Sequence, residues 1–359
     1  AVTAHFKPKG LGRFRTLPAP VVFTALKDAF EFCFKYMDDI LDAMERCHAK
    51  LRSNPQQMGN RAKHQLLDGI VKDNIKHTLQ ELGVQCWKLR DPNNNAKRDL
   101  EFYDNLRANQ GLVELYNVLM GSVQVVVGTV MARRVSELLS LRADCLFPKT
   151  DPTAPKNENT NYSIEFYNSK SGAGDTREKL IRPIPKAGAR LIWKLQKFRR
   201  KLIKIGAVSE KAGLQIAYNR QKDCFLPYSS SFYSQSFDIF CDYFETPLLE
   251  TSPNEFRRYY IRQHQLRRFF AMTFYLSSGY DGLDTLRYFL GHTDAEHLYH
   301  YISETTSGDV LRGVKAEALV HGLNTDKIAG IEKLREILKK RLTVQDVTVE
   351  ALEEAIEEL

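Results

Sequence analysis

The sequence lacks the features that mark disulfide-rich, zinc-binding, membrane and exported proteins. Its six cysteines include no CxxC pair, which indicates neither a disulfide framework nor a zinc site and fits a reducing cytosol. The longest nearly unbroken apolar stretch, Val123 to Ala132, is well short of the ~20 residues that cross a bilayer. The first twenty residues lack the apolar core of a secretory signal. These absences predict a cytoplasmic protein with no membrane partner.

What the sequence has in excess is positive charge. Its 359 residues include 52 Lys and Arg against 44 Asp and Glu, a formal net charge of +8, and 43% are hydrophobic, enough for real cores. The positive charge is clustered rather than spread, which favours a polyanionic partner. At roughly 150 residues per domain, the length predicts two to three domains.

Patterning along the chain divides it into four segments. Residues 1–20 carry four basic residues and no acid, and their prolines and glycines oppose regular structure, so they predict a flexible basic arm. That arm either follows DNA phosphates or is a disordered tail. Residues 21–98 have helical periodicity and predict a small helical domain that ends in a polar, turn-rich linker. Residues 99–325 are expected to form a larger domain, and residues 326–359 a helical tail whose charge changes from basic to acidic.

The larger domain has mixed signals. Residues 112–141 are apolar, and propensity leaves helix and strand both open. Two β-rich segments, NYSIEFYNS and REKLIRPIP, are joined by KSGAGDT, whose glycines and aspartate suit a hairpin turn. A basic helix is predicted over residues 188–205, and helices again from residue 254 to the end. The expected fold class is therefore mainly α with a small β-sheet, an α+β fold.

Three separated segments contain residue types that can bind or react with phosphate. HQLRRFF places His264 and Arg267 three residues apart, on one face of a helix, where an imidazole and a guanidinium can meet one anion. LRYFLGHTDAEHLYHYIS contains His292 and a pair of tyrosines, and ARRVSELLSLRADCL places Arg134 just before an apolar helical run.

In this order, the motifs resemble those of the tyrosine recombinase or phage integrase family. That family typically shows an RxSELLxL box, a lysine in a β-hairpin, an HxLRH box, and LGH followed nine residues later by tyrosine. The matching residues here are Arg134 in RVSELLSL, Lys170 in SKSG, His264 and Arg267 in HQLRR, His292 in LGH, and Tyr301. The chain departs from the pattern where Met131 and Ala132 replace TG and Arg268 replaces the second histidine of HxLRH, and none of these is a catalytic position.

The resemblance implies a site-specific recombinase that cleaves and rejoins double-stranded DNA through a 3′-phosphotyrosyl intermediate, as in integration or excision of a mobile element. It implies a helical core-binding domain and a catalytic domain that close around DNA as a C-shaped clamp. It also implies a homotetramer on DNA, nucleoid-associated when bound, with the C-terminal segment a candidate for docking on a neighbouring protomer. The resemblance implies that no metal is needed, because the matched residues supply the nucleophile, the positive charge and the acid. ATP is not expected, because a covalent intermediate keeps the energy of the phosphodiester.

The nucleophile and the phosphate clamp follow from the resemblance and from side-chain chemistry. Tyr301 would attack phosphorus. Tyr299 is the alternative. Residues two positions apart on a helix point about 200° away from each other, so Tyr299 and Tyr301 cannot both point into one site. Arg134 and Arg267 would offer forked donors to the non-bridging oxygens, for which lysine is a poorer substitute. Glu137, one turn past Arg134, is a candidate for holding that arginine in position.

Proton transfer is assigned to three further residues. The resemblance implies Lys170 as the general acid for the departing 5′ oxygen, with Lys179 of the same hairpin as the alternative. His264 and His292 would orient the phosphate and assist proton transfer. A metal site built from the histidines around residues 292–300 is the alternative hypothesis, but no thiol or carboxylate pattern completes a ligand shell.

Basic residues outside these motifs are candidates for contacts with the DNA backbone. They come from the basic helix and from RRYYIRQHQLRR, and they are Lys194, Arg199, Arg200, Arg258 and Arg262. A basic run can also be only a solvated face, and the tyrosines between the arginines can equally be core residues. Two further functions stay open: relaxation of supercoiled DNA by a type IB topoisomerase-like enzyme, and a non-catalytic DNA-binding regulator with the same fold.

Overall fold

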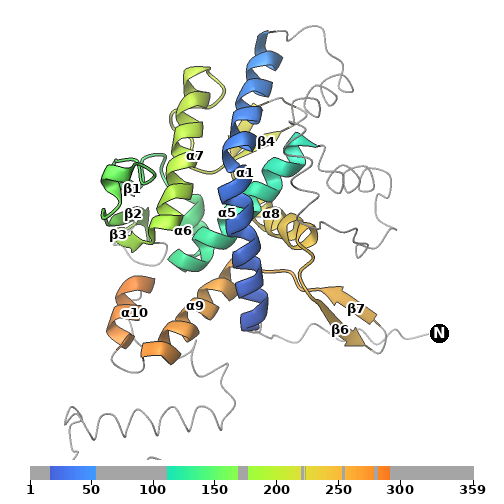
Figure 1. Ribbon diagram of the computed structural model, residues 1–359, viewed down its shortest axis with the longest axis vertical. Helices are drawn as coiled ribbons and strands as arrows, with labels where there is room; N and C mark the ends of the chain where they lie inside the picture. Colours follow the sequence, from blue (N-terminus) through green and yellow to red (C-terminus); the bar gives the residue numbers. More distant parts are fainter. Residues whose placement is uncertain are drawn as a thin grey trace, which may run out of the picture. The chain divides into compact units, whose positions relative to one another are not determined.

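The computed structural model describes residues 17–53, 111–168, 177–219, 222, 224–252, 255–278 and 282–291 (Figure 1). It is mainly helical with small antiparallel sheets, which confirms the expected α+β fold class. Contacts divide the chain into two compact units, Ala1–Phe270 and Ala271–Leu359. The predicted linker near residue 99 and the predicted tail lie outside the described residues, so the domain division from the sequence stays a prediction.

The first helix, α1 (Ala19–Ser53), is the one that the periodicity after residue 20 predicts. It begins two residues inside the predicted arm, and Leu17 before it is buried. The buried face of α1 includes Ala25, Ala29 and Phe32, and the small alanines allow close approach of a neighbouring helix. By contrast, Phe23 is 57% exposed, so the aromatic residues that mark the periodicity do not all face the core.

Residues 112–131, for which helix and strand were both open, form the helix α5 (Leu112–Met131). Nearly all of its side chains are buried. A helix that is surrounded by protein needs no polar face, so its sequence shows no helical period. Burial also overrides the β-propensity of VQVVVGTV. By length and composition α5 could cross a membrane, but 89% of its most apolar window is buried inside the protein, as in a core helix.

Three helices surround α5 in the first unit (Figure 1). These are α1, α7 (Lys186–Lys204) and α8 (Ser230–Tyr243). Helix α8 packs closely against Gly121 of α5, where a Cβ atom would collide with the carbonyl oxygen of Ser236 and would lie 2.9 Å from Cβ of Phe240. The absence of a side chain at Gly121 therefore sets the distance between these two helices.

The predicted hairpin is present as part of a three-stranded sheet. Its strands β1 (Leu146–Phe147), β2 (Tyr162–Tyr167) and β3 (Lys179–Ile184) are antiparallel in that order. The β2–β3 register pairs Tyr162 with Ile184 and Tyr167 with Lys179. In β2 every second side chain is buried, as expected when one face of a sheet covers a core.

The described part of the first unit also contains two antiparallel strand pairs. One consists of β4 (Ile216–Asn219) and β5 (Cys224–Pro227), the other of β6 (Leu248–Ser252) and β7 (Glu255–Arg258). The prediction of helix from residue 254 onward is wrong for β7, because pairing with β6 gives its backbone a partner that no local pattern reveals.

Within the described residues, two helices follow β7. The first of them, α9 (Gln263–Ser278), begins in the first unit, and α10 (Leu283–Leu290) belongs to the second. Within the second unit Leu286 and Leu290 are buried, and α10 ends at Gly291, whose φ of 66° is the left-handed conformation that favours glycine at a helix end.

Replacing Gly121 with alanine tests the close approach of α5 and α8. Because the new Cβ atom would meet backbone of α8, we expect Gly121→Ala to lower the free energy of unfolding by about 1–3 kcal/mol, the usual cost of overpacking. Urea denaturation measures it. The control is Gly213→Ala, whose Cβ atom would lie 3.3 Å from the nearest atom and should cost less. Equal, small losses in both variants would contradict the close approach.

Candidate active site

The turn that joins α5 to α6 (Val135–Leu139) presents Arg134. Ala132, at the end of α5, adopts the left-handed conformation with φ of 48°, and its N–H donates to the carbonyl of Gly128. Arg134 follows as the N-cap of α6, and its backbone N–H donates to Oε2 of Glu137 at 3.1 Å. The carboxylate of Glu137 thus satisfies a backbone donor at the start of α6.

The guanidinium of Arg134 is held through one nitrogen. Nη1 donates to Oε1 of Glu137 at 2.8 Å and to Oδ1 of Asn168, directly after β2, at 3.3 Å. Both acceptors are buried, whereas the Arg134 side chain is 19% exposed. The structure therefore brings together Arg134 and Glu137, as the sequence predicted, and adds Asn168.

Two side chains of the first two turns of α9 bind the turn between α5 and α6. Nη1 of Arg267 donates to the carbonyl of Ala132 at 2.6 Å. Nε2 of Gln263 donates to the carbonyl of Gly128 at 2.9 Å and to that of Arg133 at 3.0 Å. Because Gln263 and Arg267 lie one helical turn apart, one face of α9 binds the end of α5. The RVSELLSL and HQLRR motifs meet here.

The carboxamide of Gln263 also reaches a third helix. Its Oε1 accepts a hydrogen bond from the hydroxyl of Tyr233 in α8 at 2.9 Å, so the buried amide uses both its donor and acceptor ends. A Cβ atom on Gly128 would collide with this carboxamide. Gly128 therefore makes room for the amide that links α5, α8 and α9.

The turn between α5 and α6 contains a second arginine, Arg133. Arg133 is buried, its guanidinium lies 4.4 Å from the centre of the Phe166 ring, and its Nε donates to the carbonyl of Met131 at 2.9 Å. Burial, and after it the positive charge of Arg267, lowers the pKa of Arg133 well below its usual value. A cationic side chain in this position adds positive potential to the site.

Glu137 is the counter-charge to these arginines. Burial raises the pKa of its carboxyl group, but the charges of Arg267 and Arg134 and the hydrogen bonds from Arg134 outweigh burial, so the pKa falls below 4.5. Glu137 is therefore ionised at neutral pH. With Arg133 included, three guanidinium groups interact electrostatically with one carboxylate, and an excess of positive charge attracts an anion.

His264 lies in the first turn of α9, between Gln263 and Arg267 in sequence, with a partly exposed side chain. Partial burial and the positive charges of Arg262 and Arg268 lower its pKa below 6.5. At neutral pH His264 is therefore mainly an uncharged imidazole, with one nitrogen as donor and the other as acceptor.

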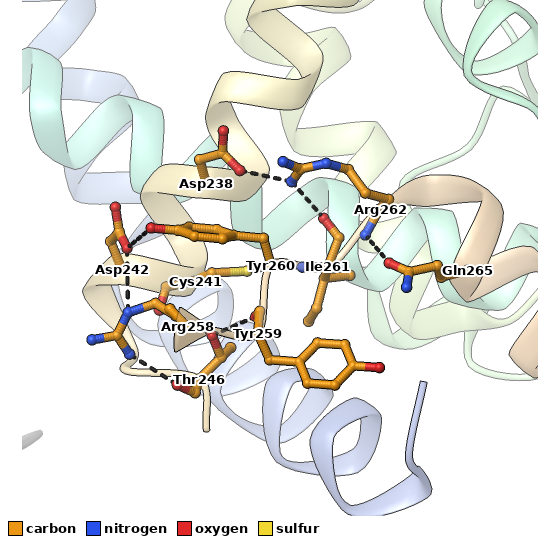
Figure 2. Close-up of polar contacts among 10 residues, drawn as sticks. All are labelled: Asp238, Cys241, Asp242, Thr246, Arg258, Tyr259, Tyr260, Ile261, Arg262 and Gln265. Atoms are coloured by element: carbon orange, nitrogen blue, oxygen red, sulfur yellow. Dashed lines mark hydrogen bonds and ion pairs between the residues drawn. The ribbon is translucent and has the colours of Figure 1, made fainter. Parts of the chain in front are cut away.

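The segment before α9 is fixed to α8 by two carboxylates (Figure 2). Asp242 pairs with Nε of Arg258 at 3.3 Å and accepts a hydrogen bond from the hydroxyl of Tyr260 at 2.7 Å. Asp238 pairs with Nη1 of Arg262 at 2.6 Å. Arg258 and Arg262, predicted to contact DNA, thus have protein partners that set where α9 begins, and their contact with DNA stays a prediction.

The predicted DNA-contacting residues of α7 also have partners in the protein. Lys194 pairs with Asp38 of α1 at 2.7 Å, and Arg200 lies over the ring of Trp193 at 4.9 Å. Arg199 is 3% exposed and donates to four backbone carbonyls of the loop that follows α7. Its observed role is to hold that loop, and the DNA contact predicted for these three residues is untested.

Three predicted catalytic residues lie outside the described residues: Lys170, His292 and Tyr301. Lys179, the alternative to Lys170, pairs with Glu165 of β2 at 2.7 Å. Within the described ranges no group of three His, Cys, Asp or Glu side chains could hold a metal ion. The alternative histidine cluster also falls outside those ranges.

Asn168, Gln263 and Arg133 were not identified from the sequence. Asn168 precedes the SKSG motif by one residue, and Gln263 stands directly before His264, but a lone amide beside a motif has no pattern that indicates its partner. Only the packing of β2 and α9 against the α5–α6 turn reveals their roles.

Comparisons with known proteins give a likeness to solved structures alone. No family model and no curated protein matches the chain. Among solved structures, the chain is similar to the XerH site-specific recombinase bound to difH substrate in a pre-cleavage complex, with 16% sequence identity and a TM-score of 0.34. The match covers 60% of this chain and 50% of that chain, so this chain spans about half the recombinase's length. A likeness at this level establishes no function.

Acidification tests the charge of Glu137. The lowered pKa means that ionised Glu137 stabilises the fold above 4.5, and that this contribution is lost as the pH falls through the folded-state pKa. We expect Glu137→Gln to lower the free energy of unfolding by about 1–3 kcal/mol at neutral pH, and the deficit to shrink on acidification. Urea denaturation at a series of pH values from neutral to acidic measures the difference in the free energy of unfolding between Glu137→Gln and the wild type. A deficit independent of pH would contradict the assignment, and Ser140→Ala in the turn after α6 serves as the pH-independent control.

The left-handed conformation of Ala132 predicts a stabilising substitution. An L-residue in this region costs about 1–2 kcal/mol, whereas glycine costs about 0.5–1 kcal/mol through the unfolded chain. We therefore expect Ala132→Gly to raise the free energy of unfolding by about 0.5–1 kcal/mol, measured by urea denaturation. Ala189→Gly, inside α7, should lower it by about 1 kcal/mol. If both substitutions destabilise equally, Ala132 is not left-handed in solution.

Proposed function

We propose that this protein is a tyrosine-type site-specific DNA recombinase, which cleaves and rejoins double-stranded DNA through a 3′-phosphotyrosyl intermediate. One observation carries the proposal. Arg134 and Arg267, from motifs far apart in the sequence, are both attached to the α5–α6 turn, and the carboxylate of Glu137 experiences the charge of both. Two guanidinium groups held at one site are suited to the non-bridging oxygens of one phosphate.

In this proposal the arginines stabilise charge that develops on the phosphate. As the attacking oxygen bonds to phosphorus, negative charge grows on the non-bridging oxygens, and donors that are already oriented stabilise it without reorganisation. Arg134 offers a partly exposed fork whose position Glu137 fixes. Neutral His264 can donate one hydrogen bond to a phosphate oxygen, and binding that anion would raise its pKa.

The remaining steps use residues assigned from the sequence. The hydroxyl oxygen of Tyr301 forms a bond to phosphorus and gives its proton to the imidazole of His264 or His292, while the bond from phosphorus to the 5′ oxygen breaks. Lys170 gives a proton to that departing oxygen, and His292 assists. Because the phosphotyrosyl ester keeps the energy of the broken bond, the free 5′ hydroxyl can rejoin by the reverse reaction without ATP.

The proposed partner is duplex DNA, bound by a homotetramer in which each protomer cleaves one strand. The net charge of +8 favours attraction to this polyanion. The C-terminal segment, after residue 325, is the proposed element that docks on a neighbouring protomer. No metal is required in the proposed chemistry, since the arginines and the lysine supply the positive charge and the acid.

Trapping the covalent intermediate tests this function. End-labelled DNA fragments that flank the gene in its source genome are incubated with the protein, and a fragment that forms an adduct is converted into a nicked suicide substrate. We expect the wild-type protein to give an SDS-resistant protein–DNA adduct. Tyr301→Phe should bind the same DNA but give no adduct, because it lacks the attacking oxygen.

Tyr299→Phe is the matched control, and it should form the adduct. An adduct from Tyr301→Phe at the wild-type level would refute the nucleophile. DNA binding by the wild-type protein without any adduct would instead support a non-catalytic regulator, and relaxation of plasmids without a specific site would support a topoisomerase.

A further inference from the structure

The hydrogen bonds of Arg134 distinguish its two edges. A guanidinium carries five N–H donors: one on Nε and two on each terminal nitrogen. Nη1 has an acceptor for each of its two hydrogens, since it donates to Oε1 of Glu137 at 2.8 Å and to Oδ1 of Asn168 at 3.3 Å. The protein thus uses all the donors of this one nitrogen.

The opposite edge of the guanidinium has different surroundings. Across the ranges that the structure describes, no hydrogen bond or ion pair of the Nε–Nη2 edge of Arg134 is observed, and the side chain is 19% exposed. Two parallel N–H groups on one edge match two oxygens of a phosphate. Because both hydrogens of Nη1 are used within the protein, the Nε–Nη2 edge is the one that can bind a substrate phosphate.

Asn168 is placed rigidly enough to make this selection. It is 2% exposed, and its backbone N–H donates to the carbonyl of Glu178 at 2.8 Å, which continues the β2–β3 pairing by one residue. A side chain on a paired, buried backbone has few alternative positions. Glu137 comes from α6, so the two acceptors approach Nη1 from different elements, and together they fix the rotation of the guanidinium.

We propose that Asn168 is a positioning residue that orients Arg134 so that its Nε–Nη2 edge faces the scissile phosphate. This inference rests on the proposed recombinase function. Glu137 alone leaves one hydrogen of Nη1 without its acceptor, so the guanidinium can turn about its bond to Glu137. A displacement of a positioned group by about 1 Å can reduce a rate by about a hundredfold.

Cleavage under single-turnover conditions, with protein in excess over suicide substrate, tests the inference. We expect Asn168→Ala to form the adduct at least about tenfold more slowly at saturating protein, with unchanged DNA affinity, since Arg134 keeps its charge. Asn168→Asp retains an oxygen acceptor at the same position and should restore the rate to within about threefold of wild type. Ser140→Ala, which removes a hydrogen bond to the carbonyl of Glu137, should cleave at the wild-type rate.

The outcomes separate this inference from the proposed function. If the wild-type protein forms no adduct, the recombinase function fails and the role of Asn168 fails with it. If the wild-type protein cleaves and Asn168→Ala cleaves equally fast, only the positioning role is overturned. It is also overturned if Asn168→Asp is as slow as Asn168→Ala, because an acceptor oxygen at residue 168 is then not the property that matters. Thermal unfolding of each variant checks that the protein is folded.

Discussion

Hydrogen bonds from the first two turns of α9 to the backbone at the end of α5 position the candidate site. Gln263 and Arg267 bind the carbonyls of residues 128, 132 and 133, at the end of α5 and in the turn that leads to Arg134. A buried carbonyl that loses its partner costs about 1–3 kcal/mol, so the turn between α5 and α6 cannot move freely relative to α9. The same hydrogen bonds that stabilise the first unit therefore keep Arg134 and Arg267, which come from two distant motifs, in a fixed arrangement.

This arrangement concentrates positive charge in the protein interior. Arg133 and Arg267 are both buried, and burial together with their mutual repulsion opposes the charged form of Arg133. Glu137 offsets part of this repulsion, and the ring of Phe166 offers Arg133 a favourable face. The site therefore carries more positive than negative charge, at some cost to the stability of the fold.

Local patterns predicted the elements whose stability is largely local. The helical period after residue 20, the alternation in β2 and the basic amphipathic stretch of α7 all correspond to observed elements. Helix α5 could not be predicted, because a helix buried on every side has neither period nor polar face. The strand β7 was predicted as helix, because a four-residue strand depends on its pairing with β6.

For the site, the sequence alone determined which chemical groups the chain carries and in what order: the Arg134 and Arg267 guanidiniums, the His264 imidazole, and the spacing of Glu137 one helical turn from Arg134. Only the tertiary structure decided which partner each group has. It assigned Asn168 to Arg134, Gln263 to the α5–α6 turn, and Arg199 to backbone carbonyls rather than to solvent. The physical reason is that hydrogen bonds and ion pairs act over a few ångströms in space, and residues far apart in the chain come that close only after the helices and strands have packed.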